Sequence, residues 1–239
     1  MAGEQGSDTI PPGLLPRLNE LAVAAVNGWK LVLPVTPLGP IDGPKCLVVP
    51  GFLASDRTTL ELRRAFADAG WRTIGWGMGL NRGAKADTLV RLRRRFEEVG
   101  RGEKLLLVGW SLGGVFAREL ARELPDHALA VVTLGSPFSG DPRWNNVWRM
   151  YELVAGHKVD SPPVTRDHRK PPVPTLALWS RRDGIVAPRA AYGLAGERDS
   201  AIEVDTTHLG FAVTRSGAAA VVAETLEFLR NSGLNIPPN

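Results

Sequence analysis

The chain contains almost no cysteine and has no long apolar run. Cys46 is the only cysteine, so no internal disulfide can form, and its apolar surroundings predict a buried structural thiol. The most apolar N-terminal stretch, residues 14–26, is interrupted by Pro16 and Glu20 and is too short to cross a bilayer. Residues 1–12 lack the basic start and apolar core of a secretory signal. We therefore expect a cytoplasmic protein without stable membrane insertion.

Signals for cofactors and nucleic acids are also missing. The histidines and the cysteine do not occur at metal-ligand spacing, and no glycine-rich loop matches a phosphate-binding pattern. We therefore expect no metal and no cofactor. The net charge of +4 is small, and its basic clusters, Arg63 with Arg64 and Arg91 with Arg93 to Arg95, fall on predicted helices without interleaved aromatic residues. Solvated helix faces explain these clusters better than a nucleic-acid site does.

The chain does contain a regular alternation of short apolar runs and amphipathic segments. Its 239 residues, 44% of them hydrophobic, suffice for one large domain. We expect a tail and a helix over residues 1–28 and the domain over residues 29–239. Alternating strands and helices predict an α/β fold with a mostly parallel sheet and helices on both faces. The expected strands are residues 29–35, 46–49, 71–76, 104–108, 129–134, 175–179 and 201–204, and the expected helices are residues 16–27, 58–69, 86–99 and 217–230, with one more between Ser111 and Pro125.

One stretch combines a strand, a sharp turn and a helix. The apolar run that ends at Val108 is followed by a GxSxG pattern centred on Ser111, and helical periodicity begins at once. A serine at the tip of such a turn has a strained backbone, so its neighbours must be very small, as Gly109 and Gly113 are. Ser111 would then project from the sheet as a nucleophile. The N–H of Leu112, at the start of the helix, is placed to bind a developing oxyanion.

This strand, turn and helix resemble the nucleophile elbow of the α/β-hydrolase superfamily, in particular of its bacterial serine esterases and lipases. In that family the triad follows the chain order serine, acid, histidine. His208 comes after the last predicted strand, within Val204-Asp-Thr-Thr-His-Leu-Gly210, where the family has its histidine loop. The resemblance, which extends from Lys45 to Arg230, therefore implies that His208 is the general base.

Two aspartates compete for the role of the triad acid. Asp183 follows a predicted strand within Trp179-Ser-Arg-Arg-Asp-Gly-Ile-Val-Ala187, which resembles the acid loop of bacterial lipases and esterases. An Asp-Gly pair is also a strong turn signal, so the alternative is an aspartate that only bonds its own backbone. Asp205 lies three residues before His208, whereas the acid must reach the far ring nitrogen from a neighbouring strand end. We therefore assign Asp183 as the acid.

The second oxyanion donor is expected in the loop Val49-Pro-Gly-Phe-Leu-Ala-Ser55, which follows another predicted strand. Many lipases and esterases have His-Gly-x at this point, and the residue after the glycine gives its backbone N–H. By resemblance that donor is Phe52. This chain has Pro50 in place of the histidine, so whatever that histidine side chain orders must be ordered by another group.

The segment from residue 140 to 174 breaks the alternation. It holds four large side chains within eight positions and then a run rich in proline and charge. We interpret residues 140–174 as a lid or cap insertion over an apolar site, because such side chains need an apolar surface to cover; the alternative is an ordinary surface excursion. The residues expected to bind substrate are Leu53, Trp110, Trp144 and Trp148.

The activity that the resemblance implies is hydrolysis of carboxylic esters through an acyl-enzyme on Ser111, with a small-molecule ester as substrate. Trp110, just before the serine, also resembles the elbow of esterases that act on carrier-bound acyl chains. An acyltransferase or a thioesterase is therefore the alternative. A binding protein that keeps the fold without turnover is a third hypothesis. Neither the acyl-chain length nor the oligomeric state follows from the sequence.

Overall fold

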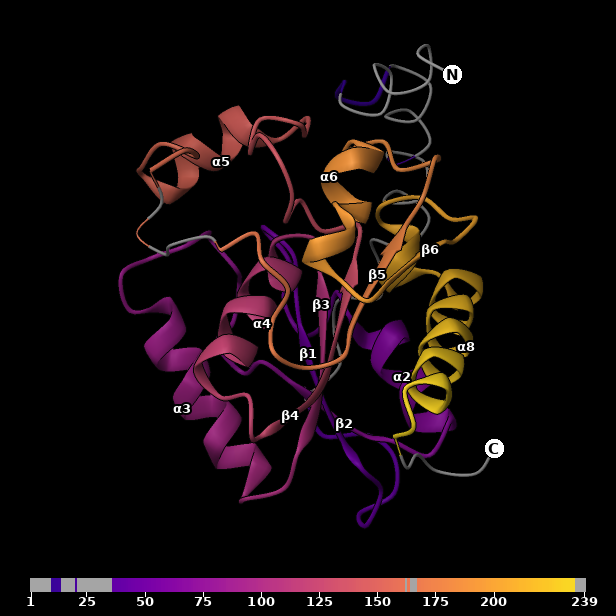
Figure 1. Cartoon of the computed structure of the whole chain (residues 1–239). Helices are drawn as coiled ribbons and strands as arrows, with labels where there is room; N and C mark the ends of the chain where they lie inside the picture. Colours follow the sequence, from indigo (N-terminus) through magenta and orange to yellow (C-terminus); the bar gives the residue numbers. More distant parts are fainter. Residues whose placement is uncertain (1–9, 14–19, 21–35, 162, 164–166, 235–239) are drawn as a thin grey trace.

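The computed structural model describes residues 10–13, 20, 36–161, 163 and 167–234 (Figure 1). Within these residues six strands form one sheet in the order β2-β1-β3-β4-β5-β6, and every neighbouring pair is parallel. The predicted parallel sheet with flanking helices is confirmed. The strands are β1 (Lys45–Val49), β2 (Arg72–Gly75), β3 (Leu105–Trp110), β4 (Ala128–Leu134), β5 (Thr175–Trp179) and β6 (Ser200–Glu203).

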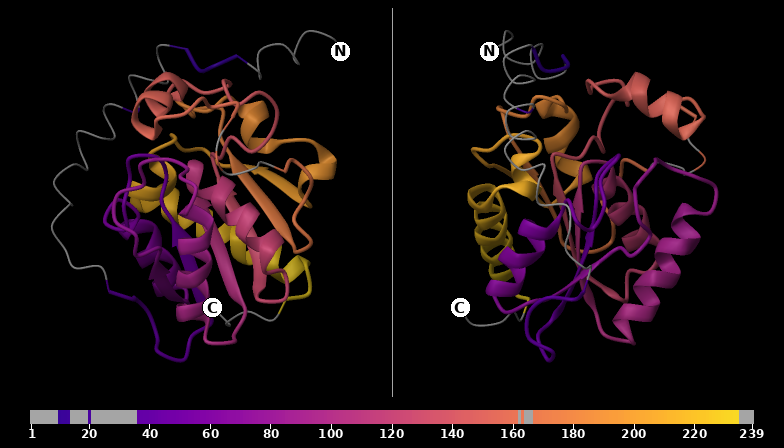
Figure 2. Two further views of the ribbon diagram at one scale, coloured as in Figure 1. Left: turned by 90° about the vertical axis from the view of Figure 1, so that its left-hand side faces the viewer. Right: turned by 180° about the vertical axis from the view of Figure 1, so that it is seen from behind.

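Helices cover both faces of this sheet. In Figure 1 α3 and α4 lie on one face and α2 and α8 on the other, and the views of Figure 2 show the same layers from the side and from behind. The helices are α2 (Leu60–Asp68), α3 (Thr88–Gly100), α4 (Leu112–Glu123), α5 (Trp148–Ala155), α6 (Pro188–Tyr192), α7 (Gly210–Val213) and α8 (Arg215–Asn231), with a 3-10 turn at Ala195–Glu197.

The burial of both faces explains why the central strands are apolar at every position. In β1, Cys46 and Val48 pack into the core on the α2 and α8 side, and Leu47 and Val49 pack into the core on the α3 and α4 side. A strand covered by helices on both faces cannot alternate with polar residues. Cys46 is fully buried, and burial raises the pKa of its thiol. It is the structural thiol expected from the sequence.

The strands β1 to β6 and the helices α2, α3, α4 and α8 match predicted elements closely, whereas α5, α6 and α7 were not predicted. The strand predicted over residues 104–108 continues to Trp110, because Gly109 and Trp110 still pair with Thr133 and Leu134 of β4. The sheet therefore reaches up to the residue directly before Ser111. The helix predicted over residues 16–27 and the strand predicted over residues 29–35 lie, apart from Glu20, outside the described residues.

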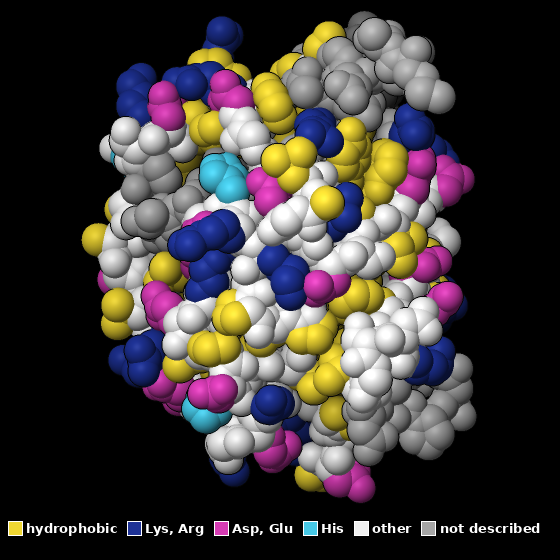
Figure 3. Space-filling view, viewed as in Figure 1, with side chains coloured by type: hydrophobic (Ala, Val, Ile, Leu, Met, Phe, Trp, Pro, Cys, Tyr) yellow, Lys and Arg dark blue, Asp and Glu magenta, His cyan; other side chains and the backbone are white. Residues whose placement is uncertain are grey.

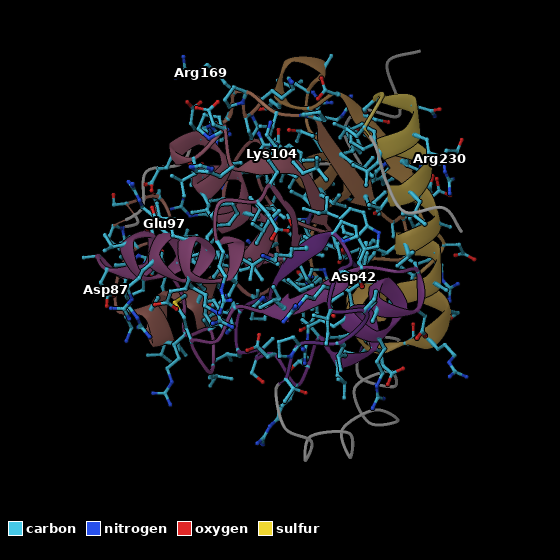
Figure 4. All side chains as sticks on the ribbon, turned by 90° about the horizontal axis from the view of Figure 1, so that it is seen from below. Asp42, Asp87, Glu97, Lys104, Arg169 and Arg230 are labelled. Carbon is cyan, nitrogen blue, oxygen red and sulfur yellow. The ribbon has the colours of Figure 1, made fainter. Side chains whose placement is uncertain are left out.

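Charges of both signs are mixed on the surface. The face in Figure 3 shows basic and acidic side chains interspersed, and on α3 Arg93 pairs with Glu97 at 3.0 Å and Arg94 with Glu98 at 3.5 Å. Asp87 and Glu97 lie at the outer edge of the molecule in the view from below (Figure 4). Arg93 and Arg94 thus belong to a solvated helix face. The expectation was wrong for Arg63, which is 1% exposed and donates to the carbonyl oxygens of Thr36 and Asp56. No helix in the described part of the chain has both the length and the apolar character needed to span a bilayer.

Candidate active site

Ser111 lies at the sharp turn between β3 and α4. Its backbone has φ 55° and ψ −124°, a conformation that costs free energy in a residue other than glycine and persists only when the surroundings enforce it. A Cβ at position 109 would lie 2.3 Å from the Cα of Gly114, and a Cβ at Gly113 would lie 2.2 Å from the carbonyl oxygen of Val49. Such distances leave room for glycine alone, in agreement with the sequence argument for this turn.

Asp183 and His208 form a buried pair. The Oδ2 atom of Asp183 is 2.7 Å from Nδ1 of His208, and each residue is only 2% exposed. The other carboxylate oxygen of Asp183 accepts the backbone N–H groups of Ile185 and Val186, both at 2.8 Å. One oxygen of Asp183 thus bonds the backbone of its own turn, while the other bonds the imidazole.

The surroundings of His208 raise the pKa of its imidazole. Burial acts against the charged form, but the attraction and hydrogen bond of the Asp183 carboxylate, together with the attraction of Glu20, outweigh it. A histidine with a raised pKa is a stronger base, and the imidazolium that it forms is stabilised by the same carboxylates. The pair is thus equipped to accept a proton and to hold it.

The competing acid and the other histidines lie elsewhere. The Asp205 side chain is 81% exposed and bonds to Arg182 at 2.9 Å, so it faces solvent. His127 directly precedes β4, and its backbone oxygen accepts the N–H of Leu105 at the amino end of β3, far along the strand from Ser111. The rings of His157 and His168 contact the backbone oxygens of Ala84 and Phe138.

Gly135, directly after β4, makes room for the Asp183–His208 pair. It has φ 52°, and a Cβ at this position would lie 2.8 Å from Oδ2 of Asp183 and 3.1 Å from Nδ1 of His208. Any side chain here would push the pair apart. Gly135 is not among the residues expected from the sequence, although it is a glycine that follows a predicted strand at the same edge as Ser111 and Asp183.

The two expected oxyanion donors are unengaged. Among the described residues, neither the Leu112 N–H nor the Phe52 N–H has a hydrogen-bond partner. The loop that carries Phe52 lies against the serine turn, since a Cβ at Gly51 would be 3.0 Å from Cβ of Ser111. Two unpaired donors thus lie on the two loops that meet at Ser111, as an oxyanion hole requires.

Asn81 holds the loop in which Pro50 replaces the histidine of many lipases. Its side-chain amide donates to the carbonyl oxygen of Pro50 at 2.8 Å, and its own carbonyl oxygen accepts the N–H of Leu53 at 2.7 Å. Its N–H donates to the carbonyl oxygen of Ala54 at 2.8 Å. Asn81 is 1% exposed, so these bonds are shielded from water. This residue, which sequence reasoning missed, orders the loop.

A mostly apolar cavity opens beside Ser111. Its walls come from the loop that carries Phe52, the start of α4, the loop after β4 and the segment around α5, and none of the lining side chains is charged. The lining residues are Phe52, Ala84, Ser111, Leu112, Val115, Phe116, Pro137, Pro142, Asn145, Val147, Trp148, Tyr151, Val159 and Val186.

Of the four residues expected to bind substrate, only Trp148 lines this cavity. The Trp110 indole N–H donates to the carbonyl oxygen of His208 at 2.9 Å, and the two rings lie 5.7 Å apart, so Trp110 supports the histidine loop. Trp144 packs on the small cluster around Val186. Leu53 is 39% exposed and does not line the cavity.

Within the segment expected to be a lid, residues between positions 142 and 159 line one side of the cavity, which we call its roof. Helix α5 of this segment lies at the end of the molecule to which the parallel strands lead (Figure 1). Tyr151 of α5 is buried, packs on the ring of Phe52 at 5.2 Å, and accepts the N–H of Ala84 through its hydroxyl at 3.1 Å. The outer side of the same helix exposes Leu153, which is 84% accessible. Among the described residues, no three His, Cys, Asp or Glu side chains are arranged to hold a metal ion.

No protein-family model and no curated protein matches the sequence, but many solved structures resemble the fold. Carboxylesterase CesB (YbfK) from Bacillus subtilis superposes with a TM-score of 0.57 at 14% identity, over 91% of this chain and 99% of that chain. A lipase-esterase related protein from Clostridium acetobutylicum gives 0.59 at 15% identity, over 81% and 98%. The thioesterase domain from the curacin biosynthetic pathway gives 0.55 at 13% identity, over 78% and 92%. The chain therefore has the α/β-hydrolase fold.

Proposed function

We propose that this chain is a serine hydrolase that cleaves carboxylic esters through an acyl-enzyme on Ser111. The observation that carries the proposal is the buried hydrogen bond of 2.7 Å between Asp183 and His208, with His208 held against Trp110, the residue before the serine. A carboxylate, an imidazole and a serine at a strained strand-to-helix turn are the three groups of a nucleophilic triad.

In the proposed reaction the Ser111 oxygen attacks the acyl carbonyl while Nε2 of His208 takes the serine proton. Asp183 accepts the N–H from the other ring nitrogen, which keeps Nε2 free to act and stabilises the imidazolium. The N–H groups of Leu112 and Phe52 bind the oxyanion. His208 then protonates the departing alcohol and leaves the acyl group on Ser111. Water, deprotonated by His208, releases the carboxylic acid and restores the serine.

The uncharged cavity beside Ser111 is the proposed acyl site, and the segment over residues 140–174 is its proposed lid. Trp148 and Tyr151 of α5 and Val159 after it would contact the acyl chain, since all three line the cavity. An ester with an apolar acyl group fits such walls, because no lining charge would have to be desolvated.

Hydrolysis rates of p-nitrophenyl esters from acetate to palmitate test the proposal. We expect turnover with a maximum along the series, and we expect Ser111→Ala to lower kcat by roughly 10⁴-fold or more while the chain stays folded. A Ser111→Ala variant that keeps the full rate would show that another group is the nucleophile.

A fluorophosphonate probe separates the alternatives if no ester is hydrolysed. Labelling of Ser111 without ester hydrolysis would favour an acyltransferase or a thioesterase, which use the same acyl-enzyme. Thioester substrates and alcohol acceptors would then distinguish these two. Absence of labelling would favour a binding protein. The resemblance in fold to a thioesterase domain makes the thioester the first substrate to add.

A further inference from the structure

A buried carboxylate from outside the sheet reaches the loops of the acid and the base. Glu20 is 5% exposed, although it precedes β1 by more than twenty residues. Its Oε1 atom accepts the backbone N–H groups of Gly184, at 3.1 Å, and of His208. Its Oε2 atom accepts the N–H of Leu209 at 2.8 Å. One carboxylate therefore bonds both the loop that begins at Asp183 and the loop that carries His208.

These bonds add to other links between the two loops, such as the bond from the Ser180 hydroxyl to the carbonyl oxygen of Thr206 at 2.5 Å. Gly184 directly follows Asp183, so Glu20 fixes the backbone on the acid side of the pair while it fixes the backbone at the base itself. Hydrogen bonds from N–H groups to a buried carboxylate are stronger than those between neutral groups. The distance between the Asp183 carboxylate and the His208 ring is therefore set partly by a third residue.

Glu20 also adds negative charge beside the imidazole. In a buried site the attraction between a carboxylate and an imidazolium is weakly screened by water. The attraction of Glu20 is one of the causes that raise the pKa of His208, after that of Asp183. The proton that His208 takes from a serine would thus be held by two carboxylates instead of one.

We propose that Glu20 is a positioning residue of the active site, one that ties the acid loop to the histidine loop and favours the imidazolium of His208. This inference rests on the proposed function, since it assigns Glu20 a part in the reaction of that same site. A purely structural role for Glu20 would also require the hydrogen bonds. A purely structural role would not require the negative charge of Glu20, so the effect of removing that charge distinguishes the two roles.

The test compares Glu20→Gln with wild type in the pH dependence of kcat/KM on the best ester. Glutamine keeps the size of the side chain but removes the charge and puts an N–H₂ group where one oxygen accepted. The base must be neutral to act, so the rate rises with pH through the pKa of His208. We expect the acidic limb of Glu20→Gln to move to lower pH and the plateau to fall by roughly tenfold to a hundredfold.

Two further variants make the test specific. Glu20→Asp keeps the charge one methylene farther away, so its acidic limb should lie between those of wild type and Glu20→Gln. Asp205→Asn removes an exposed carboxylate that bonds Arg182 and should leave both limb and plateau unchanged. A Glu20→Gln limb that coincides with that of wild type would overturn the proposal, even with a lowered plateau. If Glu20→Gln does not fold, an unmoved limb in Glu20→Asp overturns it instead.

A titration of the His208 ring by NMR gives the same answer without turnover. The His208 signal is identified by its loss in His208→Gln. A lower pKa of His208 in Glu20→Gln than in wild type supports the role of Glu20 even if no ester is hydrolysed, in which case only the proposed function fails. Identical titration curves would reject the inference and leave the proposed function intact.

Discussion

The floor and the roof of the cavity are positioned in different ways. The floor comprises the serine turn, which lines the cavity, together with Gly135 and the Asp183–His208 pair, which do not line it. Its shape comes from the ends of parallel strands, glycine contacts and N–H groups that bond carboxylates. The roof, formed by cavity-lining residues between positions 142 and 159, has two backbone bonds to residues 185–187. Its helix α5 and the residues after it are attached by side chains such as the Tyr151 hydroxyl, and by exposed ion pairs such as Arg143 with Asp160. Substitutions can remove or replace a side-chain contact, whereas a close backbone contact tolerates little change in the residues that make it.

This difference predicts that the floor determines the rate of the reaction and that the roof determines which substrates react. Surface ion pairs contribute little to stability, about 0–1 kcal/mol each, so the roof can be altered without loss of the fold. A Cβ at Gly109 or Gly113 would stand within 2.3 Å of backbone atoms, and a Cβ at Gly135 would stand 2.8 Å from Asp183, so substitution there displaces the backbone or the Asp183–His208 pair. We expect changes in the floor to abolish the reaction and changes in the roof to redirect it. The following measurements test that expectation.

Removal of the charge on the triad acid should have the largest effect. Asp183→Asn keeps the shape of the turn but offers His208 an amide, which favours the wrong imidazole tautomer, so kcat should fall by about 10⁴-fold. Asp205→Asn, in the histidine loop but exposed, should retain nearly full activity. Steady-state kinetics on one ester compares the two. A larger loss in Asp205→Asn than in Asp183→Asn would transfer the role of acid to Asp205.

A change in the roof should alter substrate choice more than rate. Trp148→Ala enlarges the cavity at α5, so the ratio of kcat/KM for long over short acyl chains should rise by roughly tenfold, while the midpoint of thermal unfolding stays nearly constant. Leu153→Ala, on the exposed side of the same helix, is the matched control and should leave the ratio unchanged. If both variants give the wild-type ratio, α5 does not contact the acyl chain.

The smallest effect concerns the dependence of stability on pH. The pKa of His208 is raised in the folded chain, so folding is favoured by its proton. This contribution is fully present below the ordinary histidine value of about 6.5 and is lost as pH rises through the higher folded value. Urea unfolding of wild type and His208→Gln over this range should show a difference in free energy that shrinks with rising pH. A difference that grows with pH would contradict the direction of the shift.

The floor could be predicted from sequence because it depends on local patterns. Apolar runs located the strands, and the resemblance to α/β-hydrolases, with the chain order serine, acid, histidine, singled out Asp183 and His208 among the residues that follow them. The glycines at positions 109 and 113 indicated the turn, because a serine at such a strand-to-helix turn needs very small neighbours. Even the end of β3 was misplaced by only two residues, because glycine and tryptophan do not look like a continued strand.

The supporting residues were not predictable in the same way. Glu20 acts on backbone groups 164 to 189 positions away, and in the sequence its charge only argued against a membrane span. Asn81 lies in a loop without periodicity, so nothing marks its amide as the partner of Pro50. Trp110 was expected in the cavity because it adjoins the serine, but adjacent residues in a strand point to opposite faces, and it lies under the histidine loop.

Because Cys46 is buried, the reactivity of its thiol can be used to follow unfolding of the chain. The thiol lies in the middle of the sheet with no exposed surface, so thiol reagents can reach it only when the sheet opens. The rate at which dithionitrobenzoate reacts with the native protein therefore measures that opening. The same burial protects electrophilic probes of the active site from a competing nucleophile, because a thiol with a raised pKa stays protonated and unreactive. Any covalent label on folded protein can thus be assigned without correction for cysteine.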